Sequence, residues 1–302
     1  MWVILLIPAF LFSLGLEELW KSALNKNPEI LSQREDVKAK EYRLKALKNL
    51  YLPLFEVQYS RVWLSEKQRL EVFPFSVDIT KKSFENYSFS LKELLYDFGR
   101  RERLIEISER KLKASKYLYE EKRQEVLYKV AEAYLNLLSV KGKIRIYEEE
   151  LKAVRSQYEL AKAYYEKGLV AITDVLQARV RMQEVKEKLR RERGNLETLL
   201  VYLSNLTGMN KERLRKLNEI KGVPEIREFN YYLKLAYERR GILKVQKERI
   251  SILENFSKVK VSEYLPQFFG GITYHYTDQN PSVEPKGYLS YFVGSKVSFQ
   301  TL

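Results

Sequence analysis

The 302-residue sequence contains no cysteine and only one histidine, His275. Without cysteine there can be no disulfide, thiol nucleophile, thiolate metal site or lipid-acceptor thiol. A single histidine cannot build a histidine-based triad or a multi-histidine metal site. The sequence also has no phosphate-binding glycine loop and no G-x-S-x-G motif, and its carboxylates fall at helical-surface spacing. We therefore predict a protein that is not an enzyme and that holds no cofactor or metal.

Glycine and proline are scarce as well, with 12 and 8 residues. That is too few for a loop-rich fold, and the 31% of charged residues suits long exposed helices better than a large spherical core. The longest apolar run lies within residues 1–15 and is too short to span a bilayer of ~30 Å as a helix. We predict that residues 1–15 are a secretory signal peptide that lacks the usual basic start. A buried N-terminal helix or strand is the alternative.

Positive charge is in excess, with 54 Lys and Arg against 40 Asp and Glu. Such a balance can indicate nucleic acid or anionic lipid as a partner. However, the basic residues alternate with acidic ones, as in Glu120-Glu121-Lys122-Arg123. This mixing favours a solvated helix face, so we predict no nucleic-acid partner. A nucleic-acid-binding protein, which would need a contiguous basic face, is the less favoured alternative.

Two long helices are predicted, over residues 99–167 and 172–206. No proline lies between Pro74 and Pro224, so no proline interrupts either helix. At 1.5 Å per residue the first would reach on the order of 100 Å. Apolar residues recur in both at the three-and-four spacing of a coiled-coil seam. In the first helix these residues are Val126, Val130, Ala133, Leu137 and Val140.

A tight turn at residues 167–174 is predicted to join the two long helices. Gly168 marks the break, because glycine tolerates the positive φ at which helices often end. Thr173 and Asp174 then occupy the positions of an N-cap and a first-turn residue, ahead of a renewed apolar repeat. The sequence thus predicts a long antiparallel helical hairpin.

Four segments alternate apolar and polar residues with a period of two, which is typical of strands with one apolar face. They are residues 54–64, 87–93, 267–277 and 287–299, and we expect a loop at 65–85. Four strands cannot close a sheet, and an open sheet edge cannot sit in lipid. If these strands cross a membrane, several copies of the chain must share them in one barrel.

The chain repeats itself at a constant offset, since Tyr51-Leu52-Pro53 returns as Tyr264-Leu265-Pro266. We divide it into the signal peptide, helices of the first repeat (16–53), a strand pair (54–93), the helical hairpin (94–206), a connector (207–224), helices of the second repeat (225–265) and a second strand pair (266–302). The second copy stops where its own hairpin should begin. We therefore expect Leu302 to be a truncation.

Three motifs carry a family resemblance. They are Y-x-x-G-L-V-x-I-T-D-V-L-Q-A at 165–178, L-E-E-L-x-x-x-A-L-x-x-N-P-E-I at 16–30, and L-L-Y-D-F-G-R at 94–100. Together they resemble the TolC-type outer-membrane efflux proteins, although Leu94 replaces that family's proline. The resemblance implies a mainly α fold with β: a long coiled-coil hairpin forming a tunnel, plus two amphipathic strand pairs in a shared trimeric β-barrel.

The resemblance also implies a function, namely passive export through a duct that serves a tripartite efflux pump or type I secretion system. The implied partners are two further copies, a periplasmic adaptor, an inner-membrane transporter and outer-membrane lipid, with the helices projecting into the periplasm. Gly168, Leu169 and Val170 would contact the adaptor, and Thr173 and Asp174 would form the gate. Helix capping is the alternative role for Asp174. A periplasmic coiled-coil scaffold or adaptor protein, or a non-functional truncated fragment of the channel, is the alternative for the whole chain.

Overall fold

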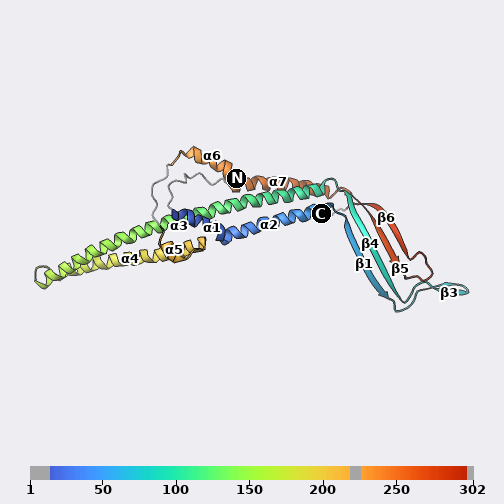
Figure 1. Cartoon of the computed structure of the whole chain (residues 1–302), viewed down its shortest axis with the longest axis horizontal. Coiled ribbons are helices and arrows are strands. Elements are labelled where there is room, and N and C mark those ends of the chain that lie inside the picture. The colour runs from blue at the N-terminus through green and yellow to red at the C-terminus, as the bar shows by residue number, and fades with distance from the viewer. Residues whose placement is uncertain (1–13, 218–225, 298–302) are drawn as a thin grey trace. The chain divides into compact units, whose positions relative to one another are not determined.

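The computed structural model describes residues 14–217 and 226–297, which form two compact units (Figure 1). The first unit contains the residues up to Asp36 together with Lys116–Leu243. The second contains Val37–Ser115 together with the residues from Lys244 on. The predicted signal peptide lies outside the described residues, except that Leu14 and Gly15 open the first helix.

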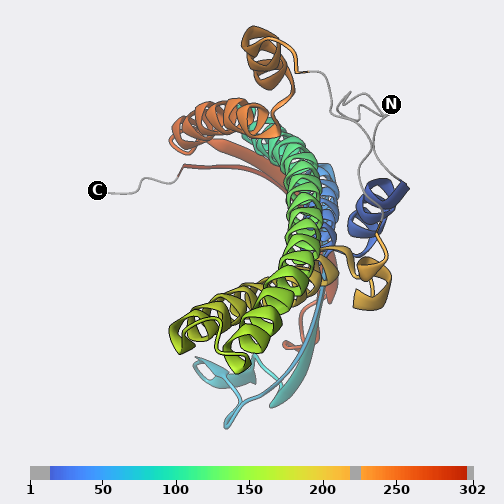
Figure 2. The same ribbon diagram turned by 90° about the vertical axis from the view of Figure 1, so that its left-hand side faces the viewer.

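The first unit is helical. Its elements are α1 (Leu14–Lys26), the start of α2 (Pro28–Lys48), the part of α3 (Arg100–Glu166) from Lys116 on, α4 (Ile172–Thr207), α5 (Lys211–Arg215) and α6 (Phe229–Arg239). α3 and α4 lie side by side and meet at a short turn (Figure 2). The two long predicted helices are therefore confirmed, with ends within one residue of the expected positions.

The core of the first unit lies where α1 crosses α3 and α4. It contains the predicted seam of α3 from Val126 to Leu137 and is completed from the other helices by Leu16, Leu19, Ile30, Leu200, Leu203 and Leu214, among others. The last seam residue, Val140, is buried as well but lies outside this cluster. Hydrogen bonds fix α1 against this core. Trp20 Nε1 donates to Leu127 O at 3.0 Å, and Asn27 Nδ2 donates to Leu206 O at 3.0 Å. Leu206 O is one of the last four carbonyls of α4, which have no partner within the helix, whereas Leu127 O lies inside α3 and can accept this bond in addition to its helical one.

Nearer the turn, the hairpin holds a second and smaller core of Val154, Met182 and Val185. Ion pairs across its two helices flank this core. Arg181 lies 3.1 Å from Glu150, and Arg193 lies 2.7 Å from Glu148. The side chains of both pairs are 30–60% exposed, so each pair contributes little to stability. Apolar burial holds the two helices together here.

The second unit contains a four-stranded antiparallel sheet. Its strands are β1 (Leu54–Trp63), β4 (Ser83–Tyr96), β5 (Gln267–Thr277) and β6 (Gly287–Lys296), in the order β1-β4-β5-β6. The helical part of this unit includes α7 (Gly241–Ser262) from Lys244 on and α3 up to Ser115. Buried Glu248 of α7 joins them, because it pairs with Arg110 and Lys113 of α3 at 3.4 and 2.8 Å.

The structure corrects three details of the expected layout. Residues 65–85 are not a plain loop: β2 (Arg69–Val72) and β3 (Phe75–Asp78) form a separate hairpin there, and β4 already starts at Ser83. The strand expected at 87–93 therefore extends beyond both ends. The connector contains α5, which is ordered by burial of Leu214 and by an Asn210 side chain that caps its first turn. The expected end of the last strand, at 298–299, lies outside the described residues.

The internal repeat also appears in the element bounds. α2 starts at Pro28 and α7 at Gly241, while β1 starts at Leu54 and β5 at Gln267, so both pairs are separated by 213 residues. A short three-residue helix, Asn49–Tyr51, follows α2 before the first strand. In each repeat a long helix is thus followed along the chain by a strand of the four-stranded sheet.

Candidate functional site: the hairpin tip and the sheet faces

The turn between α3 and α4 is built around Gly168, whose φ is +68°. The Gly168 N–H donates to Tyr165 O and the Leu169 N–H donates to Tyr164 O, both at 2.9 Å. These two bonds form the Schellman arrangement, which ends a helix at a left-handed residue. A Cβ at Gly168 would meet nothing within 4 Å, so backbone conformation rather than space is what requires glycine here.

Asp174 caps the helix that follows the turn. Its carboxylate accepts a hydrogen bond from the Ala171 N–H at 3.2 Å, and its own N–H donates to Ala171 O at 3.1 Å. The N-cap is thus Ala171, which has no side-chain acceptor, and the expectation that Thr173 holds this position is wrong. Thr173 lies inside the first turn of α4, which begins at Ile172. The capping role for Asp174 is observed directly.

The tip exposes apolar side chains. Leu169 is 67% exposed, while Val170 is half-buried. Ile172 and Leu176 on α4 are exposed as well. A protein rarely leaves such a cluster in water without a use for it. The structure therefore brings the five predicted tip residues together on one short surface, although their proposed contacts with other chains are not part of it.

The sheet has one apolar face, identified from its register. Rows such as Phe89–Tyr274 and Leu91–Ile272 place apolar residues side by side across neighbouring strands. The members of this face are Phe55, Val57, Tyr59, Tyr87, Phe89, Leu91, Ile272, Tyr274, Tyr276, Leu289 and Tyr291. Most of them are exposed. Ring contacts cross the strands, with 5.0 Å between the centroids of Tyr59 and Tyr87.

The opposite face is polar and mostly uncharged. Ser90 and Thr273 are both buried there and their hydroxyls lie 3.2 Å apart. The Asn86 amide donates to the Ser60 hydroxyl at 3.3 Å. One ion pair, between Lys92 and Glu56 at 3.0 Å, lies nearer the helices. Hydroxyl and amide groups of this kind are suited to contact with water.

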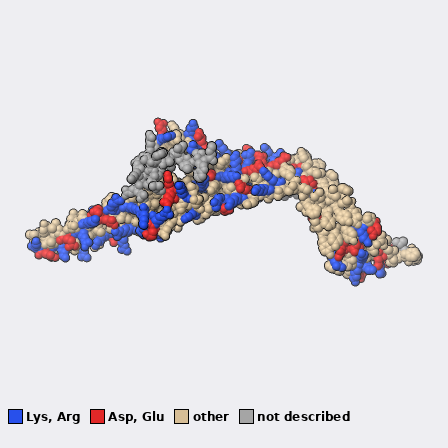
Figure 3. All heavy atoms as spheres, viewed as in Figure 1, with Lys and Arg blue, Asp and Glu red and all other residues tan. Residues whose placement is uncertain are grey.

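Charged residues bound the apolar face at both ends. Arg61 and Glu85 pair at 3.7 Å at the end away from the helices. Glu93 and Arg101 pair at 3.5 Å at the end near them. Figure 3 shows the zone between as a largely uncharged surface over the strands, with charged atoms gathered at the outer end. The apolar face is therefore a band rather than a whole surface.

The junction between β4 and α3 was not predicted as a site, although its D-F-G-R motif was noted. Asp97 accepts hydrogen bonds from the Arg101 backbone N–H at 2.9 Å and from Arg101 Nε at 3.2 Å, so it caps α3. Phe98 and Gly99 both have positive φ, which reverses the chain from strand to helix. The signal that could have marked Glu93 is its position, since it interrupts the apolar alternation of β4.

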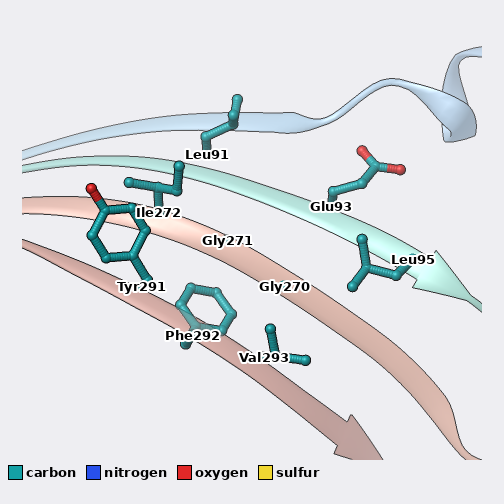
Figure 4. A pocket seen from close by; sticks show the side chains of 9 residues that line it. All are labelled: Leu91, Glu93, Leu95, Gly270, Gly271, Ile272, Tyr291, Phe292 and Val293. Atoms are coloured by element: carbon teal, nitrogen blue, oxygen red, sulfur yellow. The ribbon is translucent and has the colours of Figure 1, made fainter.

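A hollow lies on the apolar face near this junction (Figure 4). Its volume is about 440 Å³, and it is open to the outside. Gly270 leaves the gap, because the row Glu93–Gly270–Val293 has no side chain at its centre. The wall is formed by Leu91, Glu93, Leu95, Ile272, Tyr291, Phe292 and Val293.

Neither a metal site nor a membrane-spanning helix occurs in the described residues. In residues 14–217 and 226–297 no three His, Cys, Asp or Glu side chains are grouped so that they could hold a metal ion. Nor does any helix in those ranges combine the length and apolar character needed to cross a membrane.

More than half of the chain matches a known family model. The match covers residues 19–209, and the model describes the outer membrane efflux proteins. The chain belongs to the outer membrane efflux protein family. The resemblance that three motifs indicated is thereby confirmed. A comparison with curated proteins found no match to this chain.

Solved structures of several outer-membrane proteins share the fold. VceC from Vibrio cholerae superposes with a TM-score of 0.78 at 15% identity, covering 95% of this chain and 69% of that one. The Campylobacter jejuni channel CmeC gives 0.79 at 16%, covering 95% and 62%. The open state of MtrE from Neisseria gonorrhoeae gives 0.70 at 12%, covering 95% and 64%. The chain thus spans about two thirds of the length of these outer-membrane proteins.

These likenesses confirm the predicted fold class, mainly α with strands and a long helical hairpin. The hairpin and the sheet are thus parts of a fold that this chain shares with those proteins. The roles of Gly168, Leu169, Val170, Thr173 and Asp174, and the identity of the partners, stay predictions.

Proposed function

We propose that this chain is a subunit of an outer-membrane export channel, in which the sheet lines a pore and the helical hairpin extends it into the periplasm. The observation that carries the proposal is the two-faced sheet. An exposed apolar band on one side and hydroxyl and amide groups on the other suit a wall between lipid and water. The soluble scaffold considered above has no use for such a band.

The height of the band fits a membrane. Along β4 the charged limits Glu85 and Glu93 lie eight residues apart, which at ~3.4 Å per residue gives ~27 Å along the strand. Strands of membrane barrels tilt by about 40°, which reduces this to ~21 Å along the normal. The apolar band of such barrels is about 25 Å tall. The agreement supports a membrane-crossing sheet.

The number of strands supports an oligomer. In the described sheet, β1 and β6 each have a neighbour on one side only. Three copies would give twelve strands, within the range of known barrels. The trimer is passive in this proposal: it provides a path, and an inner-membrane transporter drives export.

The tip residues complete the proposal. Gly168, Leu169 and Val170 present an apolar turn that would dock against a periplasmic adaptor. Thr173 and Asp174 would hold the closed entrance by bonds to a neighbouring hairpin. The exposure of Leu169 supports docking, whereas the local bond of Asp174 leaves one carboxylate oxygen for a second partner.

Because the chain has no cysteine, single cysteines can test the wall directly. Val57 and Gln58 are neighbours on β1 that point to opposite faces. After reconstitution of the full chain into phosphatidylcholine vesicles, a water-soluble maleimide should label Gln58→Cys quickly and Val57→Cys slowly. Equal labelling of both residues, with β structure retained by circular dichroism, would contradict a membrane-crossing sheet.

A further inference from the structure

We propose that the hollow over Gly270 is a binding site for a phospholipid whose headgroup carries a primary ammonium, as in phosphatidylethanolamine. An acyl chain would lie in the hollow, and the ammonium would bind Glu93. The inference rests on the proposed function, because it requires the apolar face to meet lipid. The inference goes beyond the proposed function because it names one class of lipid and one position on the sheet.

The shape of the hollow fits an acyl chain. Leu91, Leu95, Ile272 and Val293 surround it with aliphatic carbon, as Figure 4 shows. Gly270 forms the floor, where a Cβ would come within 3.3 Å of Leu95 Cδ1 and 3.7 Å of Val293 Cγ2. A flat sheet face offers lipid only one layer of contacts, whereas this recess offers contacts from the sides as well.

Glu93 supplies the polar end. Its Oε1 accepts a long bond from Arg101 at 3.5 Å, while Oε2 is buried and has no hydrogen-bond partner. A buried carboxylate oxygen without a donor is costly, so such an atom needs an explanation. The second unpartnered buried atom in the described chain, Arg100 Nε, does not line the hollow.

A primary ammonium is the donor that fits this position. Glu93 lies at the helix-side limit of the apolar band, where headgroups would meet the protein. Its opposite charge attracts an ammonium, and the three N–H groups of the ammonium can bond to Oε2 after rotation of the carboxylate about its soft terminal torsion. A choline headgroup carries the same charge but has no N–H donor. The site should therefore discriminate between two otherwise matched lipids.

The experiment uses the full chain in vesicles with equal amounts of phosphatidylethanolamine and phosphatidylcholine. After mild detergent extraction, mass spectrometry measures the ratio of the two lipids retained by the protein. We expect about tenfold enrichment of phosphatidylethanolamine, as one charge-assisted bond would give. Glu93→Gln should abolish this enrichment, whereas Glu56→Gln, which removes a carboxylate from the polar face, should leave it unchanged.

Gly270→Ala provides a second variant with intact charge. Its methyl group occupies the floor, so retention of both lipids should fall while any residual preference for phosphatidylethanolamine remains. Equal retention of the two lipids by the unmodified chain, or enrichment that persists in Glu93→Gln, would overturn the site. If Val57→Cys is lipid-shielded in the same vesicles, such a result counts against the site alone. If Val57→Cys is open to water, it counts against the proposed function as well.

Discussion

Replacing Gly168 by alanine tests whether the hairpin tip depends on a left-handed residue. Gly142 provides a matched control, because it lies inside α3, and a Cβ would meet nothing within 4 Å at either glycine. The two positions differ in φ, which is +68° at Gly168 only. Alanine reduces the freedom of the unfolded chain equally at both sites, so that contribution cancels in their difference.

The magnitude follows from the two conformations. Alanine at Gly142 should stabilise the helix by about 1 kcal/mol. At Gly168 the same gain is opposed by ~1–2 kcal/mol of left-handed strain, so the net change should be slightly destabilising. The two variants should therefore differ by roughly 1–2 kcal/mol in the free energy of unfolding of the first unit.

The assay is urea unfolding followed by the fluorescence of Trp20, which is half-buried and packs against the core of the first unit. Trp2 and Trp63 are replaced by phenylalanine in all samples. Hydrogen exchange provides a local readout, since the amides of Gly168 and Leu169 should lose protection in Gly168→Ala. If Gly168→Ala is as stable as Gly142→Ala and these amides stay protected, the tip does not depend on a left-handed glycine.

Further predictions concern the core, the cap and pH. Leu200→Ala should lower the free energy of unfolding by about 2–5 kcal/mol because Leu200 is 0% exposed, whereas Val201→Ala, at a position 39% exposed, should lower it far less. Urea midpoints measure both changes, and equal effects would show that the core is misplaced. Asp174→Ala should destabilise α4 by about 1 kcal/mol through loss of its cap and, if the gate exists, raise single-channel conductance in planar bilayers. Unchanged conductance with normal assembly would leave the cap as its only role. The Lys81 ammonium lies 2.7 Å from the Asp278 carboxylate and lowers the pKa of Asp278. Ionised Asp278 therefore stabilises the fold above its ordinary pKa of 3.8, and this stabilisation is lost as the pH falls through the lower pKa of the folded state. Thermal unfolding should show Asp278→Asn to be less stable at neutral pH and equal in strong acid; a gap that persists in acid would exclude this charge effect.

The long elements of the fold could be predicted because their signals extend over many residues. The seam from Val126 to Val140 is buried over about four turns, and Gly168 is the only glycine near the centre of the hairpin that needs a positive φ. β2 and β3 were missed because four-residue strands are too short to show an alternation. α5 was missed because burial of Leu214, a tertiary contact, orders it.

The candidate site likewise has one part that the local sequence predicts and other parts that it does not. The location of the tip follows from local chain chemistry, and it was predicted correctly. The N-cap was assigned wrongly to Thr173 because Asp174 caps from within the helix, which allows an alanine at the cap position itself. The hollow at Gly270 depends on the register of three strands, β4, β5 and β6, and pairwise register cannot be read from one segment.

The free strands at both ends of the sheet link its folding to protein concentration. β1 leaves the helices and β6 returns to them, so β6 of one copy can pair antiparallel with β1 of the next by rotation alone. Until this happens, each copy exposes unbonded amides and carbonyls along two strands beside an apolar band. A single copy in water therefore has two strand edges that can pair with another chain. In the trimer that we propose, the lifetime of a single copy should shorten as the protein concentration rises, because each encounter either adds a copy to the barrel or starts aggregation.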